Sequence, residues 1–142
     1  MILLDTNVIS ALMQRTPEEK VVAWLDAQPR ESVWTTSISV FEVFTGLRMM
    51  PTGNRQRTLI ASFEQILSDL LEGRIADFDS EAARCAAEWL EEQKRNGRTM
   101  EMRDTMIAGI VLSRKATLAT RNERHFVGIA TVNPWTVLLE TP

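Results

Sequence analysis

Apolar residues along the chain fall into short continuous runs and helix-spaced sets that alternate with each other. The first run, Ile-Leu-Leu at 2–4, contains no polar position and is typical of a strand that is covered on both faces. Polar residues follow at 5–7, and apolar positions 8, 9, 11 and 12 then have the spacing of a helix. The start of the chain therefore predicts a buried strand that leads directly into a helix.

The same alternation continues to the end of the chain. Short apolar or β-prone runs predict further strands at 32–36, 75–78, 117–120 and 129–132. Helical spacing predicts helices that begin near Pro17, at an N-cap on Ser37, over 59–71, from Ser80 to Asn96 and near Asp104. Strands that alternate with helices form parallel sheets. We therefore predict a single α/β domain over 1–142, with a central parallel sheet of four to five strands between two layers of helices.

Composition narrows the class of protein. The 142 residues are 44% hydrophobic and 25% charged, which is ordinary for a compact globular domain. A formal charge of -3 argues against a protein that coats nucleic acid through bulk electrostatics. The single Cys85 cannot form an internal disulfide, and no apolar stretch approaches the roughly 20 residues needed to cross a bilayer. We therefore expect a cytoplasmic protein without a membrane span.

Acidic and amide side chains occur where the predicted sheet would bring them together. Asp5 directly follows the first strand, and Glu42 lies about one turn into the helix after the second. Asp104 opens the helix before the fourth strand, and Asn122 follows that strand. Because ligand sites form at the carboxyl ends of parallel strands, all four can converge there. Clustered carboxylates repel each other unless a cation neutralises them, and oxygen ligands with few histidines suit Mg²⁺ or Mn²⁺.

Phosphodiester cleavage is the reaction that most often needs such a cluster, because the ions activate water and stabilise the leaving oxygen. A phosphotransferase with an aspartyl nucleophile is a rival, since it also places an aspartate after the first strand. The sequence disfavours this rival because Asn7, rather than a second aspartate, stands two positions after Asp5. The chain also lacks a glycine-rich phosphate-binding loop.

Each candidate also has a purely structural explanation. Asp5 and Asp104 suit the starts of helices, where a side-chain cap and the helix dipole favour a carboxylate. A glutamate such as Glu42 is ordinarily a solvated surface residue, and Asn122 suits a turn after a strand. From the residues alone, both explanations stay open.

Four segments of the chain carry a more specific signal. They are Leu-Leu-Asp-Thr-Asn-Val-Ile-Ser at 3–10, Thr-Ser-Ile-Ser-Val-Phe-Glu at 36–42, Arg-Asp-Thr-Met-Ile-Ala at 103–108, and Leu-Ala-Thr-Arg-Asn at 118–122 with Val-Asn-Pro-Trp at 132–135. In this order and separation the chain resembles the PIN-domain ribonucleases, and more narrowly the VapC or FitB type of bacterial toxin. The resemblance implies a PIN-like fold and a metal-dependent endoribonuclease, the toxin of a type II toxin-antitoxin module.

The resemblance also implies roles for individual residues. The metal-binding carboxylates would be Asp5, Glu42 and Asp104, with Asn122 at the fourth, more variable position of the catalytic set. The supporting polar residues would be Thr6, Ser39 and Thr120. Arg103 and Arg121 are candidates for contacts to RNA phosphates. His125 stands where relatives commonly have an acidic residue, so we expect one tightly bound ion and a second that is recruited with substrate.

Partners follow from the same resemblance. We expect RNA as the substrate, a homodimer, and a small, basic, DNA-binding antitoxin whose tail enters a groove near the active site. The acidic balance of the chain suits a basic partner. The alternative is a catalytically weak protein of the same fold that acts mainly in a DNA-bound complex with its antitoxin.

Overall fold

The computed structural model describes residues 1–138, in which five parallel strands form one sheet. The strands, in chain order, are β1 (Ile2–Leu4), β2 (Val33–Thr36), β3 (Ile75–Ala76), β4 (Thr117–Ala119) and β5 (Thr131–Val132). Across the sheet their order is β3-β2-β1-β4-β5, and every neighbouring pair is parallel. The helices of the described part are α1 (Thr6–Met13), α2 (Glu19–Asp26), α3 (Ser37–Arg48), α4 (Asn54–Gln65), α5 (Ser80–Arg95) and α6 (Met102–Arg114). The predicted α/β fold is confirmed.

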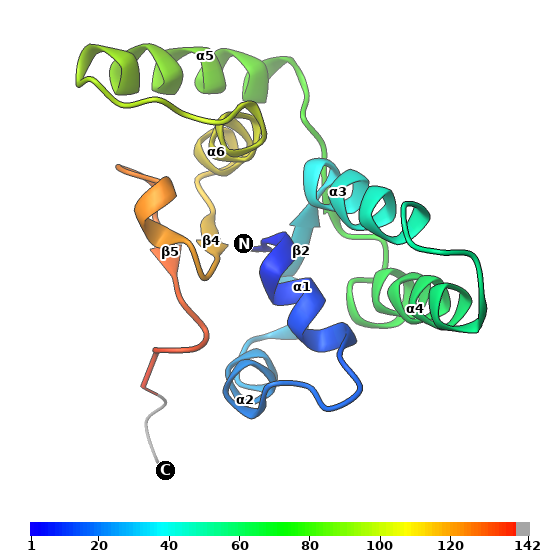
Figure 1. The fold of residues 1–142 in the computed structure, drawn as a ribbon. Helices are drawn as coiled ribbons and strands as arrows, with labels where there is room; N and C mark the ends of the chain where they lie inside the picture. The colour runs from blue at the N-terminus through cyan, green and yellow to red at the C-terminus, as the bar shows by residue number, and fades with distance from the viewer. Residues whose placement is uncertain (139–142) are drawn as a thin grey trace.

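The two faces of the sheet are covered by different helices, as Figure 1 shows. Successive side chains of a strand point to opposite faces, so Leu3 and Leu4 enter different cores. Leu3 packs with Leu118 in a cluster that includes residues of α5 and α6. Leu4 packs with Ala119 in a second cluster that includes residues of α1 to α4. The wholly apolar run at the start of the chain is explained by this burial on both sides.

The strand order changes direction next to β1. From β1 the chain proceeds outward to β2 and β3, and it later returns to form β4 on the opposite side of β1. The residues that follow β1 and β4 therefore meet at the carboxyl edge of the sheet, where the Asp5 backbone N–H donates to the Ala119 carbonyl at 2.9 Å. Open α/β sheets bind their ligands in the crevice at such a reversal.

Two helices begin at residues other than those expected. Thr36 rather than Ser37 is the N-cap of α3, because its hydroxyl accepts from the Ser39 backbone N–H at 3.0 Å. Ser37 is instead the first helical residue, and its hydroxyl accepts from the Phe78 backbone N–H. The helix predicted over 59–71 already begins at Asn54, and 66–70 is π-helical. Within the described part of the chain, no helix is long and apolar enough to span a membrane.

Helix α6, which carries Asp104, packs closely against α5 at Gly109. A Cβ atom on Gly109 would lie 2.3 Å from the Ala82 carbonyl oxygen and 2.6 Å from the Ala86 Cβ. Glycine is therefore required here because the two helices approach each other too closely for a side chain. This contact sets the position of α6, and with it the position of Asp104.

We predict that Gly109→Ala lowers the free energy of unfolding by about 1–3 kcal/mol, because the added methyl group forces the two helices apart. The matched control is Gly46→Ala in α3, where an added Cβ meets no atom within 4 Å. Because alanine favours helix more than glycine does, this control should gain up to about 1 kcal/mol. Urea unfolding measures both changes, and a Gly109→Ala protein as stable as the wild type would contradict the close packing.

Candidate active site

Asp5 lies at the junction between β1 and α1 and is held from two directions. It is the N-cap of α1, where its Oδ1 accepts from the Thr6 backbone N–H at 2.8 Å. Its Oδ2 accepts from the Thr120 hydroxyl, just after β4, at 2.8 Å. The residue is completely buried, so hydrogen bonds rather than water must stabilise its charge. The ends of two neighbouring strands therefore fix this carboxylate.

Helices α3 and α6 supply the two other candidate carboxylates. Glu42 lies in the second turn of α3, and its side chain is 33% exposed. Asp104 lies in the first turn of α6, where the helix dipole favours a negative charge, and the residue is only 4% exposed. Burial raises the pKa of the Asp104 carboxyl above its usual value, although Arg103 and His125 pull the pKa in the opposite direction. Asp104 is thus a carboxylate whose ionisation the fold makes costly.

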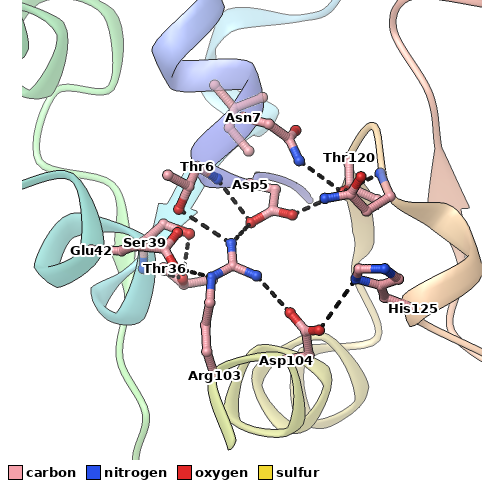
Figure 2. A network of polar contacts seen from close by, with 12 residues as sticks. Asp5, Thr6, Asn7, Thr36, Ser39, Glu42, Arg103, Asp104, Thr120 and His125 are labelled. Atoms are coloured by element: carbon pink, nitrogen blue, oxygen red, sulfur yellow. Dashed lines mark hydrogen bonds and ion pairs between the residues drawn. The ribbon is translucent and has the colours of Figure 1, made fainter. Parts of the chain in front are cut away.

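The Arg103 guanidinium joins all three carboxylates, as Figure 2 shows. Its Nη2 donates to Asp5 Oδ1 at 2.5 Å and its Nη1 to Asp104 Oδ1 at 2.6 Å. Its Nε is paired with Glu42 Oε2. Burial disfavours the charged guanidinium, but the three carboxylates outweigh this effect and raise the pKa of Arg103 above its ordinary value. The predicted acids therefore do converge, and their common centre is a positive charge from the same chain.

The three expected supporting residues contribute in different ways. Thr120 contacts Asp5 directly, and the Thr6 hydroxyl accepts from Arg103 Nη2 at 3.3 Å. Ser39 instead accepts a hydrogen bond from the Thr36 hydroxyl at 3.2 Å. Its contact lies at the start of α3, so it supports Glu42 only through the helix that carries Glu42. The functional role predicted for these three residues stays a prediction.

Asn122 and Arg121 lie at the edge of the site after β4. The Asn122 backbone N–H donates to Thr120 Oγ1 at 3.1 Å, and the residue is exposed. The Arg121 guanidinium lies over the Trp135 ring, 4.8 Å from its centroid. These contacts place both residues close to the strand end that holds Asp5, while their predicted roles in catalysis and RNA binding stay predictions.

The central position of Arg103 and the contacts of two other residues were not predicted from the sequence. His125 Nδ1 lies 3.4 Å from Asp104 Oδ2, a contact that was not predicted from the sequence. The Asn7 side chain donates to Thr120 Oγ1 at 3.4 Å and accepts from the Arg121 backbone N–H at 3.2 Å. The available signals were weak: a basic residue next to Asp104, and an amide two positions after Asp5.

The three carboxylates of the cluster are the type of ligand that a hard divalent ion prefers. In this structure, however, their positions suit the larger Arg103 guanidinium, which each of them contacts. Among residues 1–138, no three His, Cys, Asp or Glu side chains are arranged so that they could hold a metal ion. The place of a cation in the cluster is taken by Arg103.

A groove begins beside the cluster and runs between α1, α3 and α4. Its volume is about 950 Å³, and its lining is mostly apolar. Thr6 and Glu42 contribute to the groove as well as to the cluster, and Gly46 and Leu47 lie further along α3. Arg15 and Arg55 add positive charge to the lining. A ligand in this groove would therefore reach the carboxylates.

Comparisons with known proteins agree on one family. A family model described as PIN domain matches residues 2–131. The VapC ribonuclease Y4jK of Sinorhizobium fredii is 36% identical over 137 residues, which cover 95% of this chain and 98% of that protein. The toxin FitB of Neisseria gonorrhoeae is also 36% identical over 137 residues, which cover 95% of this chain and 99% of FitB. A structure of FitAB bound to an IR36 DNA fragment matches with a TM-score of 0.89 and 35% identity, and the match covers 99% of this chain and 100% of that one.

We predict that Asp104→Asn stabilises the metal-free protein by about 1 kcal/mol at pH 7.5, because it removes a buried charge. The raised pKa of Asp104 means that the folded state binds this proton more tightly than the unfolded state. The free energy of unfolding of the wild type should therefore rise relative to that of the variant as the pH falls from 7.5 toward about 4.

Thermal unfolding in EDTA over this pH range measures the difference between the two proteins. Asp26→Asn, which changes an exposed aspartate at the end of α2, is the control and should match the wild type throughout. A gap that widens on acidification would show that the fold favours the ionised form of Asp104.

Proposed function

The chain is a member of the PIN domain family, and within it of the VapC/FitB-type toxins, and we propose that it is a Mg²⁺- or Mn²⁺-dependent endoribonuclease. The observation that carries the proposal is the convergence of Asp5, Glu42 and Asp104 from three elements on one positive charge. The likeness to a protein named as a VapC ribonuclease supports RNA as the substrate.

The buried and the exposed residues of the cluster would have different roles in holding the ion. A bound divalent ion would activate water for attack on a phosphodiester and offset the charge that develops as the bond breaks. Asp5 and Asp104 would hold the ion from fixed positions, because both are buried and each has a polar partner other than Arg103, namely Thr120 for Asp5 and His125 for Asp104. Glu42 is one-third exposed and has room to adjust as the ion and the substrate bind. Thr6 and Thr120 would keep the Asp5 carboxylate aimed into the cluster.

The residues that follow β4, at the edge of the site, would contact the substrate. We place Asn122 in the fourth position of the catalytic set, at the rim beside Thr120. Arg121 would contact RNA phosphates from the same edge, and Arg103 would do so when it is not paired with the carboxylates. Contacts of this kind position a strand but do not select its sequence.

We also propose that the chain acts in the cytoplasm as the toxin of a toxin-antitoxin module and that it forms a homodimer. Its inhibitor would be a small, basic, DNA-binding antitoxin. The likeness to the toxin FitB and to the DNA-bound FitAB structure supports this assignment. The groove between α1, α3 and α4 would receive a segment of the antitoxin, because it is mostly apolar and begins at Glu42.

We expect Asp5→Asn to lower the rate of Mn²⁺-dependent RNA cleavage at least about 100-fold, because a neutral amide is a poorer ligand than a carboxylate. The far-ultraviolet circular dichroism of the variant should remain that of the wild type. Asp26→Asn removes the same charge at an exposed position and should retain full activity.

Cleavage of total RNA by the purified, antitoxin-free protein provides the measurement. An Asp5→Asn protein with full activity would refute the enzyme proposal. A wild-type protein that binds no Mn²⁺ and leaves every RNA intact would favour the alternative, a PIN-fold binding protein that acts with its antitoxin on DNA.

The groove assignment predicts that Gly46→Phe weakens antitoxin binding at least about tenfold, because the ring occupies space that the partner needs. The variant should still fold, since a side chain on Gly46 points into open space. Gly46→Ala adds only a methyl group and should bind like the wild type. Isothermal titration with the antitoxin tests both variants, and unchanged affinity of Gly46→Phe would place the antitoxin elsewhere.

A further inference from the structure

All three guanidinium nitrogens of Arg103 are used in contacts to the carboxylate cluster. Each of its three guanidinium nitrogens is paired with a different carboxylate, one from the start of α1, one from α3 and one from α6. Among the described residues, no buried side-chain nitrogen or oxygen lacks a hydrogen-bond partner. The cluster is therefore satisfied as it stands, without any ligand.

The charge of the cluster is nevertheless not balanced. When all three carboxylates are ionised, one guanidinium leaves two negative charges uncompensated. His125 would reduce this excess further only when its ring is protonated. The cluster therefore still attracts a second cation, or a cation of higher charge, while Arg103 is in place.

A guanidinium and a divalent ion cannot occupy the centre of the cluster together. Arg103 donates to Asp5 Oδ1 and Asp104 Oδ1, two oxygens that an ion at this centre would use as ligands. The guanidinium and the ion would also repel each other, because both would contact the same carboxylate oxygens. Arg103 is the part that can move, because its side chain is 26% exposed whereas those of Asp5 and Asp104 are 0% and 6% exposed.

We propose that Arg103 is a resident counter-cation that holds the three carboxylates together in the metal-free protein and that a divalent ion must displace. This inference rests on the proposed function, since it assumes that the cluster binds such an ion. Displacement makes the affinity for metal lower than the carboxylates alone would give. The released guanidinium then lies at the rim of the site, where phosphate groups of a substrate would approach.

The first experiment measures Mn²⁺ affinity by electron paramagnetic resonance titration. Arg103→Met removes the competing charge but keeps an unbranched side chain, so Mn²⁺ should bind about tenfold or more tightly than in the wild type. Arg103→Lys keeps a positive charge and should stay within about threefold of the wild type. Arg124→Met removes an exposed arginine outside the cluster and should leave the affinity unchanged.

The outcomes separate this inference from the proposed function. A wild type that binds Mn²⁺ while Arg103→Met binds it equally or more weakly would overturn the displacement and leave the enzyme proposal intact. Failure of both the wild type and Arg103→Met to bind Mn²⁺ would overturn both proposals.

A second measurement needs no substitution of Arg103 in the titrated protein, and it decides the question even if Arg103→Met does not fold. The Nε–H resonance of Arg103 is followed in the wild type by nuclear magnetic resonance while Mg²⁺ is added, and it is assigned from its absence in the Arg103→Lys spectrum. The resonance should lose its hydrogen-bonded chemical shift as Mg²⁺ saturates the site. A resonance that stays in place while Mg²⁺ binds would overturn the proposal.

Discussion

Carboxylates that are buried close together stay ionised only if a positive charge lies among them, because the protein interior screens their repulsion poorly. In this chain Asp5 and Asp104 are almost completely removed from water, and Glu42 is partly exposed beside them. The Arg103 guanidinium supplies the charge and contacts all three side chains. The arrangement of α1, α3 and α6 around the end of β1 brings the guanidinium and the three carboxylates together.

The sheet determines where these charged side chains meet. Leu3 and Leu4 bury the two faces of β1 in separate cores, which fixes this strand at the centre of the sheet. Asp5 is therefore held rigidly at the point where the strand order reverses, and Thr120 reaches it from the neighbouring strand end. The close approach of α5 and α6 at Gly109 then fixes the helix that brings Asp104 to the same point. Packing far from the cluster thus controls the spacing of its charges.

The fold and the converging acids could be predicted because they depend on local patterns. A wholly apolar run before Asp5 and alternating strands and helices sufficed to predict a parallel sheet and to bring distant acids to one edge. The roles of Arg103 and His125 could not be predicted, because they depend on side-chain directions that spacing does not encode. Thr36 and Ser37 are both good caps, so only the hydrogen bond to the Ser39 N–H distinguishes them.

The proposed displacement of Arg103 would give the candidate site two states, one closed by the chain's own guanidinium and one with a metal ion in its place. The most direct test is a crystal structure of the wild-type protein grown with Mn²⁺, in which anomalous scattering locates the ion. We predict one strong peak between Asp5, Glu42 and Asp104, with the Arg103 guanidinium turned away from all three. A Mn²⁺ peak elsewhere on the protein, with Arg103 still paired to the carboxylates, would contradict it.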